Sequence, residues 1–113
     1  LPYDVAERGY CKVYAHSSNV NNQRKKNIAL LNEALEHFKS SNYDECIRLY
    51  KVFINVDTTN KEAYNVLGMA YMRINNYSNA IIFFKKAISI DPKWNLARNN
   101  LNWAMSELKK SRQ

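Results

Sequence analysis

Residues 61–94 read KEAYNVLGMAYMRINNYSNAIIFFKKAISIDPKW. Apolar and small side chains recur in this stretch at helical spacing, in two runs that Asn75 and Asn76 separate. Because short amide side chains compete for backbone groups and tolerate turn geometry, this asparagine pair predicts a break between two helices. The stretch therefore predicts a helical hairpin.

Both helices of this hairpin have recognisable ends. Asn60 can cap the first helix by accepting a hydrogen bond from a free backbone amide, which predicts a helix from Lys61 to about Ile74. The second helix is predicted over residues 77–90. It must stop there because Asp91 precedes a proline, and a residue before proline is pushed out of helical dihedrals.

The same residue pattern occurs 34 positions earlier, over residues 27–60. Repetition at a fixed period of this length is typical of helical solenoids, in which each hairpin buries its apolar side against the next. In this earlier copy Asn42 precedes Glu45 by three residues, which predicts a capping box at the start of its second helix. Residues 27–60 and 61–94 are therefore interpreted as two successive repeats.

Residues 95–113 repeat the pattern only in part. Arg98 and Asn102 stand at two positions that are tyrosine and glycine in the hairpin. A last helix has no neighbour on one side, so polar groups there face water. We therefore expect a C-terminal capping helix at about residues 94–110, followed by a basic tail.

Residues 1–26 fit the period less well. The spacing of a second helix recurs in residues 3–13, but at an offset of 40 positions. We expect residues 3–16 to be the second helix of a preceding repeat whose first helix is missing, and residues 17–26 to be a polar connector. A chance helix is the alternative. A chain that starts halfway through a hairpin favours a fragment of a longer protein.

Composition agrees with a helical protein. The chain has 113 residues, 46% of them hydrophobic, but two glycines and two prolines are too few for a loop-rich β architecture. No apolar run approaches the roughly 18 residues that a membrane span requires. The two cysteines argue against a disulfide framework and favour a reducing compartment such as the cytoplasm, without identifying one.

Residues 61–94 resemble the tetratricopeptide repeat (TPR) family at all eight of its signature positions. Residues 27–60 match moderately, with His37 and Thr58 among the departures from the family pattern. The resemblance covers about residues 27–110. It implies an all-α fold of antiparallel helix pairs in a right-handed superhelix with a concave groove and a C-terminal capping helix. The eight matching residues are Tyr64, Leu67, Gly68, Tyr71, Ala80, Phe84, Ala87 and Pro92.

In this family, particular positions of each first helix line the groove. In this chain those positions are largely apolar, with a few polar side chains that would orient a ligand. An open patch of this kind is unusual unless something covers it, and methionine and aromatic side chains suit an adaptable binding surface. The implied groove residues are Leu31, Leu35, Phe38, Lys39, Glu62, Asn65, Met69, Met72, Arg73, Leu96, Asn99 and Trp103.

These features favour a protein-interaction scaffold that binds an apolar peptide or helix in the groove. Three alternatives stay open. The same face could join a second copy of the chain, or residues 1–26 could fold into the groove. The module could also be the soluble tail of a larger membrane-bound bacterial enzyme, because the ending at residues 99–104 resembles such repeat tails.

TPR domains that bind chaperone tails hold a terminal carboxylate with lysine, arginine and asparagine side chains at fixed groove positions. A carboxylate buried without cations is costly. We therefore do not expect chaperone-tail binding, since the corresponding residues of this chain are Leu31, Leu35, Val66, Leu96 and Asn100.

The formal net charge of +7 raises the question of nucleic-acid binding, because phosphates attract clustered Lys and Arg. The basic residues lie mainly in connectors or near helix ends, where cations complement the backbone dipole. No nucleic-acid motif accompanies them. We therefore expect a protein or peptide partner and no nucleic acid.

An enzyme is not expected either. Cys11, His16, His37 and Cys46 are the candidate zinc ligands, but their separations match no common zinc spacing. Glu33 lies one helical turn from His37, yet no nucleophile accompanies the pair. The chain has no glycine-rich phosphate loop and no serine elbow. The sequence predicts no catalytic residue, no metal and no cofactor.

Overall fold

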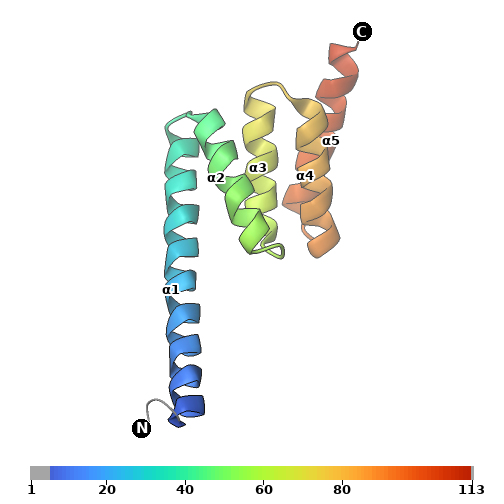
Figure 1. The fold of residues 1–113 in the computed structure, drawn as a ribbon. Coiled ribbons are helices and arrows are strands. Elements are labelled where there is room, and N and C mark those ends of the chain that lie inside the picture. Colours follow the sequence, from blue (N-terminus) through green and yellow to red (C-terminus); the bar gives the residue numbers. More distant parts are fainter. Residues whose placement is uncertain (1–5, 113) are drawn as a thin grey trace.

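The computed structural model describes the backbone of residues 6–112 and the side chains of residues 22–112. Within this range the chain forms α-helices joined by short turns, and consecutive helices lie side by side in antiparallel order (Figure 1). The prediction of an all-α fold is confirmed. None of the described helices is both long and apolar enough to cross a membrane. The helices are α1 (Ala6–Lys39), α2 (Tyr43–Val56), α3 (Lys61–Arg73), α4 (Tyr77–Ile90) and α5 (Asn95–Ser111).

The predicted ends of α3 and α4 are confirmed by their caps. Oδ1 of Asn60 accepts a hydrogen bond from the amide of Ala63 at 2.9 Å, at the start of α3. Oδ1 of Asn76 accepts one from the amide of Asn79 at 3.3 Å, at the start of α4. Helix α4 ends at Ile90, immediately before the aspartate–proline pair. These local signals set the length of the second hairpin.

The turn between paired helices also repeats. Ser41 and Asn75, 34 positions apart, have φ angles of 62° and 63°, in the left-handed region. In each turn the amide of the following residue donates to a carbonyl oxygen five residues earlier, at 2.8 and 2.9 Å. This hydrogen bond is characteristic of a helix that ends on a left-handed residue. The two hairpins therefore have the same turn conformation and the same turn hydrogen bond.

The capping box predicted at the start of α2 is wrong. Asn42 lies at the N-cap position, but its side chain makes no capping hydrogen bond. Instead, Nδ2 of Asn42 lies 3.2 Å from Nδ1 of His37, and Glu45 forms an ion pair with Arg48. Each side chain has a competing polar partner, so neither turns back to the backbone of the helix start.

The polar connector expected at residues 17–26 is helix instead. Helix α1 continues through this segment from Ala6 to Lys39. The segment is polar but contains no glycine or proline, and its Gln, Arg and Lys residues have good helix propensity. Nothing in it therefore breaks a helix. The side-chain pattern of the half-repeat expected at residues 3–16 lies outside the described residues.

Small residues allow the helices to approach closely. Ala34, Cys46, Gly68 and Ala80 are all buried, as the repeat pattern predicts for the contact within each hairpin. A Cβ atom added at Gly68 would lie 2.6 Å from Cε1 of Phe84, whose side chain is fully buried. Helices α3 and α4 can therefore pack at this distance only with glycine at this position.

An aromatic stack joins α3 to α4. The ring of Phe83 stacks on Tyr71, with 5.6 Å between centroids and an interplanar angle of 1°. It also stacks on Tyr64, at 6.4 Å and 15°. Offset stacking of this kind adds about 0.5–1.5 kcal/mol per pair to the burial of the rings. The stack holds α4 against the side of α3 that carries Tyr64 and Tyr71. The opposite side of α3 is left for other contacts.

An ion pair fixes the start of α3 to the connection between α4 and α5. Nζ of Lys61 pairs with the carboxylate of Asp91 and lies 4.8 Å from the centre of the Trp94 ring. The hydrogen bond from Lys61 lowers the pKa of Asp91 below its usual value. This connection helps to place α5 beside α3.

Candidate partner-binding face

On one side of the molecule α3 contacts α1 through Arg73 and contacts α5 through Asn65. The guanidinium carbon of Arg73 in α3 lies 5.8 Å from the centre of the Phe38 ring in α1. Nδ2 of Asn100 in α5 donates a hydrogen bond to Oδ1 of Asn65 in α3, at 3.0 Å. We call the surface that these helices share the inner face; its residues are Phe38, Met69, Met72, Arg73, Trp103 and Glu107.

A pocket of about 470 Å³ opens on the inner face between α3 and α5. Arg73 reaches it from α3 and Trp103 from α5, while Met72 is only 4% exposed. Its wall is both polar and apolar, so it offers a partner an apolar contact and groups that fix orientation. The residues that line the pocket are Met72, Arg73, Asn75, Tyr77, Trp103 and Glu107.

The pocket combines an exposed aromatic ring with charges of both signs. Trp103 is 47% exposed, which is high for a tryptophan. Arg73 supplies a cation and Glu107 an anion, and Nζ of Lys110 lies 3.4 Å from Oε2 of Glu107. Tryptophan and arginine are the residue types most enriched at the energetic centres of protein interfaces. The arrangement suits recognition of a peptide.

The structure brings part of the expected groove set together. Met72, Arg73 and Trp103 line one pocket, and Phe38 contacts Arg73 beside it. Met69 is half-buried one turn of α3 away and lies at the same repeat position as Trp103, 34 residues earlier. The pocket and the contact between Arg73 and Phe38 therefore join four of these residues, and Met69 lies on the same helix as two of them.

Other members of the expected set lie apart from this pocket. Glu62, Leu96 and Asn99 are exposed but do not line it. Leu31 lies in another hollow, of about 240 Å³, between α1 and the end of α2. Leu35 is half-buried on α1, and the exposed Lys39 pairs with Glu36, with 3.8 Å between Nζ and Oε2. The expected groove is therefore longer than the pocket that the structure forms.

Asn65 lies between helices and is closed to a ligand. It is 4% exposed, its Oδ1 accepts from Asn100, and its Nδ2 donates to Sδ of Met69 at 3.6 Å. A buried amide is stable only while its hydrogen bonds are made. Asn65 therefore holds α5 against α3 and positions Trp103.

Replacing Asn100 with alanine is expected to lower the free energy of unfolding by about 1–3 kcal/mol, because the buried carbonyl of Asn65 would lose its donor. Urea denaturation followed by circular dichroism measures this change. Asn99→Ala is the matched control, since Asn99 is exposed on the same helix and its loss should change stability by less than about 0.5 kcal/mol. Equal stability of the two variants would contradict the role assigned to this hydrogen bond.

Sequence reasoning missed Glu107, although the period contains a signal for it. Glu107 lies 34 positions after Arg73, which in turn lies 34 positions after Lys39. The incomplete match of residues 95–113 to the repeat obscured this equivalence. Asn75 and Tyr77 were missed for a different reason, because they belong to the turn and the second helix, outside the first-helix positions that the family implies.

The candidate reactive residues are placed as packing residues. Cys46 is fully buried, and burial raises the pKa of its thiol to about 11, so the thiol is protonated at neutral pH. Nε2 of His37 lies 3.9 Å from Oε2 of Glu33. Across the described residues, no three His, Cys, Asp or Glu side chains group in a way that could hold a metal ion. Cys11 and His16 lie outside the described side chains.

Comparisons with known proteins agree on the fold. The family model described as tetratricopeptide repeat matches residues 61–93. The first TPR of Spaghetti (RPAP3) bound to HSP90 peptide SRMEEVD is similar, with a TM-score of 0.72 and 23% identity over 76% of this chain and 68% of that one. The second TPR of the same protein, bound to the same peptide, has a TM-score of 0.74 and 24% identity, over 81% and 85%.

Proposed function

Because residues 61–93 form a tetratricopeptide repeat and the chain has the fold of TPR domains, we propose that this protein-interaction scaffold binds a partner peptide or helix on its inner face. The observation that most supports this proposal is the pocket that joins Arg73, Trp103 and Glu107. An exposed tryptophan beside charges of both signs in a concave site offers affinity and orientation together.

The proposed mechanism is burial of an apolar side chain of the partner against Trp103. The neighbouring Met69 is half-buried, and its flexible thioether can adjust to the shape of that side chain. Arg73 would donate hydrogen bonds to a carboxylate or carbonyl oxygen of the partner, and Glu107 would accept one from an amide N–H or pair with a cation. Covering three or four large side chains contributes on the order of 5 kcal/mol before ordering costs, which corresponds to a Kd of about 0.2 mM at best.

We also propose that the protein acts without catalysis. The protonated thiol of Cys46 is a poor nucleophile, and the imidazole of His37 packs beside Glu33 and Asn42 on α1 and the following turn. The pocket on the inner face contains a cation, an anion and an aromatic ring, but no nucleophile paired with a base. Its chemistry is that of a binding surface.

The HSP90 peptide SRMEEVD, which the two similar structures hold, is expected to bind this chain weakly. Leu31 and Leu35 are half-buried apolar side chains, and the amide of Asn100 already donates to Asn65. A carboxylate placed there would lose water without gaining a cation. Titration of SRMEEVD by isothermal calorimetry should give a Kd above about 1 mM. A Kd near about 1 μM would contradict this specificity.

A further inference from the structure

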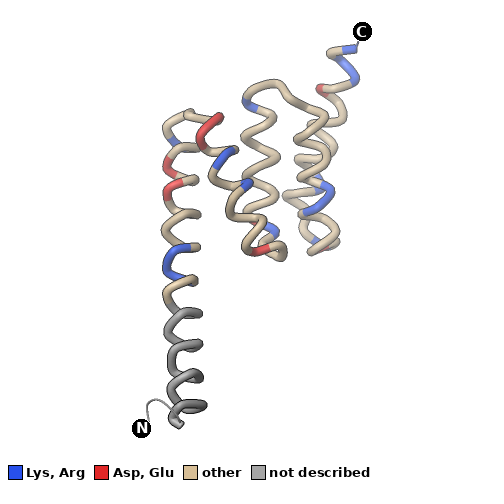
Figure 2. Tube along the Cα trace, viewed as in Figure 1, with Lys and Arg blue, Asp and Glu red and all other residues tan. Residues whose placement is uncertain are grey.

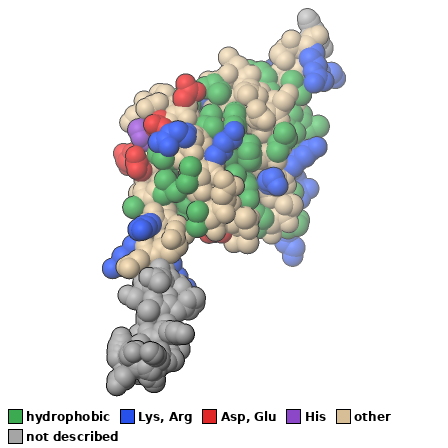
Figure 3. Space-filling view, in the orientation of Figure 1, with side chains coloured by type: hydrophobic (Ala, Val, Ile, Leu, Met, Phe, Trp, Pro, Cys, Tyr) green, Lys and Arg blue, Asp and Glu red, His purple; other side chains and the backbone are tan. Residues whose placement is uncertain are grey.

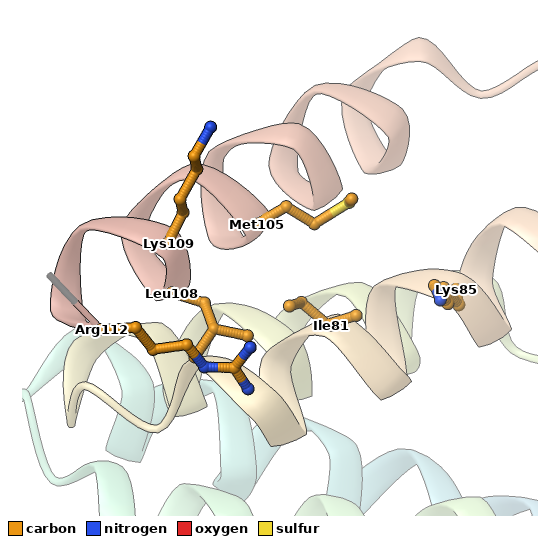
Figure 4. A pocket seen from close by; sticks show the side chains of 6 residues that line it. All are labelled: Ile81, Lys85, Met105, Leu108, Lys109 and Arg112. Atoms are coloured by element: carbon orange, nitrogen blue, oxygen red, sulfur yellow. The ribbon is translucent and has the colours of Figure 1, made fainter.

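A second pocket, of about 520 Å³, lies between α4 and α5. Ile81 of α4 and Leu108 of α5 lie in the space between the two helices (Figure 4). Met105 also lines this pocket; it is two residues from Trp103 in α5 and so projects from nearly the opposite side of that helix. We call this pocket the end groove; its residues are Ile81, Lys85, Met105, Leu108, Lys109 and Arg112.

The repeat shows which surface of the preceding hairpin corresponds to the end groove. Ile81 lies 34 positions after Ile47, and Met105 lies 34 positions after Tyr71. In the preceding hairpin this surface is covered, since Tyr71 is 5% and Ile47 9% exposed. Over Tyr71 the covering element is α4, whose Phe83 ring stacks on the tyrosine ring.

In the end groove the corresponding surface is open. Met105 is 50% exposed and Ile81 is half-buried. The open side of α5 at Met105 therefore corresponds to the side of α3 on which α4 lies. A helix is accordingly the element that fits this groove.

The rim of the end groove is basic. Lys85, Lys109 and Arg112 are exposed, and none of the six lining residues is acidic. Lys and Arg lie along α4 and at the end of α5, whereas acidic residues gather near the turn between α1 and α2 (Figure 2). In the space-filling view basic side chains lie over the α4 and α5 side, whereas side chains of both signs lie over α1 and α2 (Figure 3). Such a rim attracts carboxylates and repels a second copy of this chain, whose formal charge is +7.

We propose that the end groove binds an acidic amphipathic helix of a partner protein, laid along the groove between α4 and α5 as α4 lies against α3. The apolar stripe of that helix packs on Ile81, Met105 and Leu108. Its Asp and Glu side chains face Lys85 and Lys109 across the rim. This site is separate from the inner face, so either site can exist without the other.

The test uses three labelled synthetic peptides of about four helical turns. The acidic peptide keeps the apolar positions of residues 77–90 and has glutamate at the exposed ones. The basic peptide has lysine at those positions, and the scrambled peptide has the composition of the acidic one without its periodicity. In fluorescence anisotropy the acidic peptide is expected to bind in the micromolar range, and the other two at least about tenfold more weakly.

Variants locate the binding. Met105→Asp is expected to abolish binding of the acidic peptide, whereas Trp103→Asp, a similarly exposed position on the same helix, leaves it unchanged. Lys85→Glu combined with Lys109→Glu should weaken the acidic peptide about tenfold and strengthen the basic one. Both lysines are exposed, so this pair tests the proposal even if Met105→Asp fails to fold.

Several outcomes would overturn the proposal. They are no binding of the acidic peptide, equal binding of the scrambled peptide, and binding that survives the change at Met105. Sedimentation tests whether a second copy of the chain occupies the end groove instead. A wild-type dimer that Met105→Asp converts to monomer would assign the groove to that second copy. A monomer at every concentration supports a foreign helix.

Discussion

A Gly68→Ala variant is expected to lose about 1–3 kcal/mol of the free energy of unfolding. Alanine favours a helix over glycine by about 1 kcal/mol, which alone would stabilise the variant. The new Cβ, however, would lie 2.6 and 2.7 Å from two ring carbons of Phe84, and that ring is fully buried. A ring enclosed on all sides cannot move away cheaply, so the clash outweighs the propensity. Urea denaturation measures the difference.

The control for this prediction removes the ring. In a Phe84→Leu background the clashing ring atoms are gone, so the same Gly68→Ala change should cost less than in the wild type. A double-mutant cycle gives the coupling between the two positions. An equal cost in both backgrounds, or a stabilised Gly68→Ala variant, would show that α3 and α4 do not approach as closely as the structure has them.

A variant with Met69→Asp and Trp103→Asp is expected to lose about a hundredfold or more in affinity for inner-face peptides. The peptides are those that a random phage-displayed library yields on the wild-type chain. Trp103 is 47% exposed, so a carboxylate there opposes an apolar ligand at little cost to the fold, whereas the half-buried Met69 packs against the core and its replacement also lowers stability. Affinity is measured by fluorescence anisotropy, and helical circular dichroism checks the fold.

Met105→Asp is the matched control for this variant. Met105 is 50% exposed, lies two residues from Trp103 and faces the end groove, so peptides of the inner face should bind it normally. Unchanged affinity after Met69→Asp and Trp103→Asp would defeat the proposed site. Sedimentation at increasing concentration addresses self-association, since a dimer that Trp103→Asp dissociates would assign the inner face to a second copy.

The parts of the fold that could be predicted from the sequence are those with local causes. The ends of α3 and α4 follow from two asparagine caps and one residue before proline, and each acts within a few positions along the chain. Predictions failed where a side chain had an alternative hydrogen-bond partner, or where a segment lacked a helix-breaking residue. Asn42 contacts His37 in place of the helix start, and α1 continues through residues 17–26 because they contain no glycine or proline.

The candidate site could be predicted only in part. The repeat period predicts on which side of a helix a residue lies, but it does not predict how closely the next helix approaches that side. Met72, Arg73 and Trp103 do share one pocket. Asn65 occupies an expected groove position, but α5 approaches so closely that Asn100 covers it. The end groove was not predicted. Whether it is open depends on what covers α4 and α5, and the residue pattern within these two helices does not show that.

Nuclear magnetic resonance titration tests the central claim most directly. A library-selected peptide is added to the isotope-labelled chain, and shifts of backbone amides and of the indole N–H of Trp103 are followed. Binding on the inner face predicts that the largest shifts cluster at Arg73, Trp103 and Glu107, with little change at Met105. Largest shifts at Met105 and Leu108, or none at the Trp103 indole under saturating peptide, would contradict it.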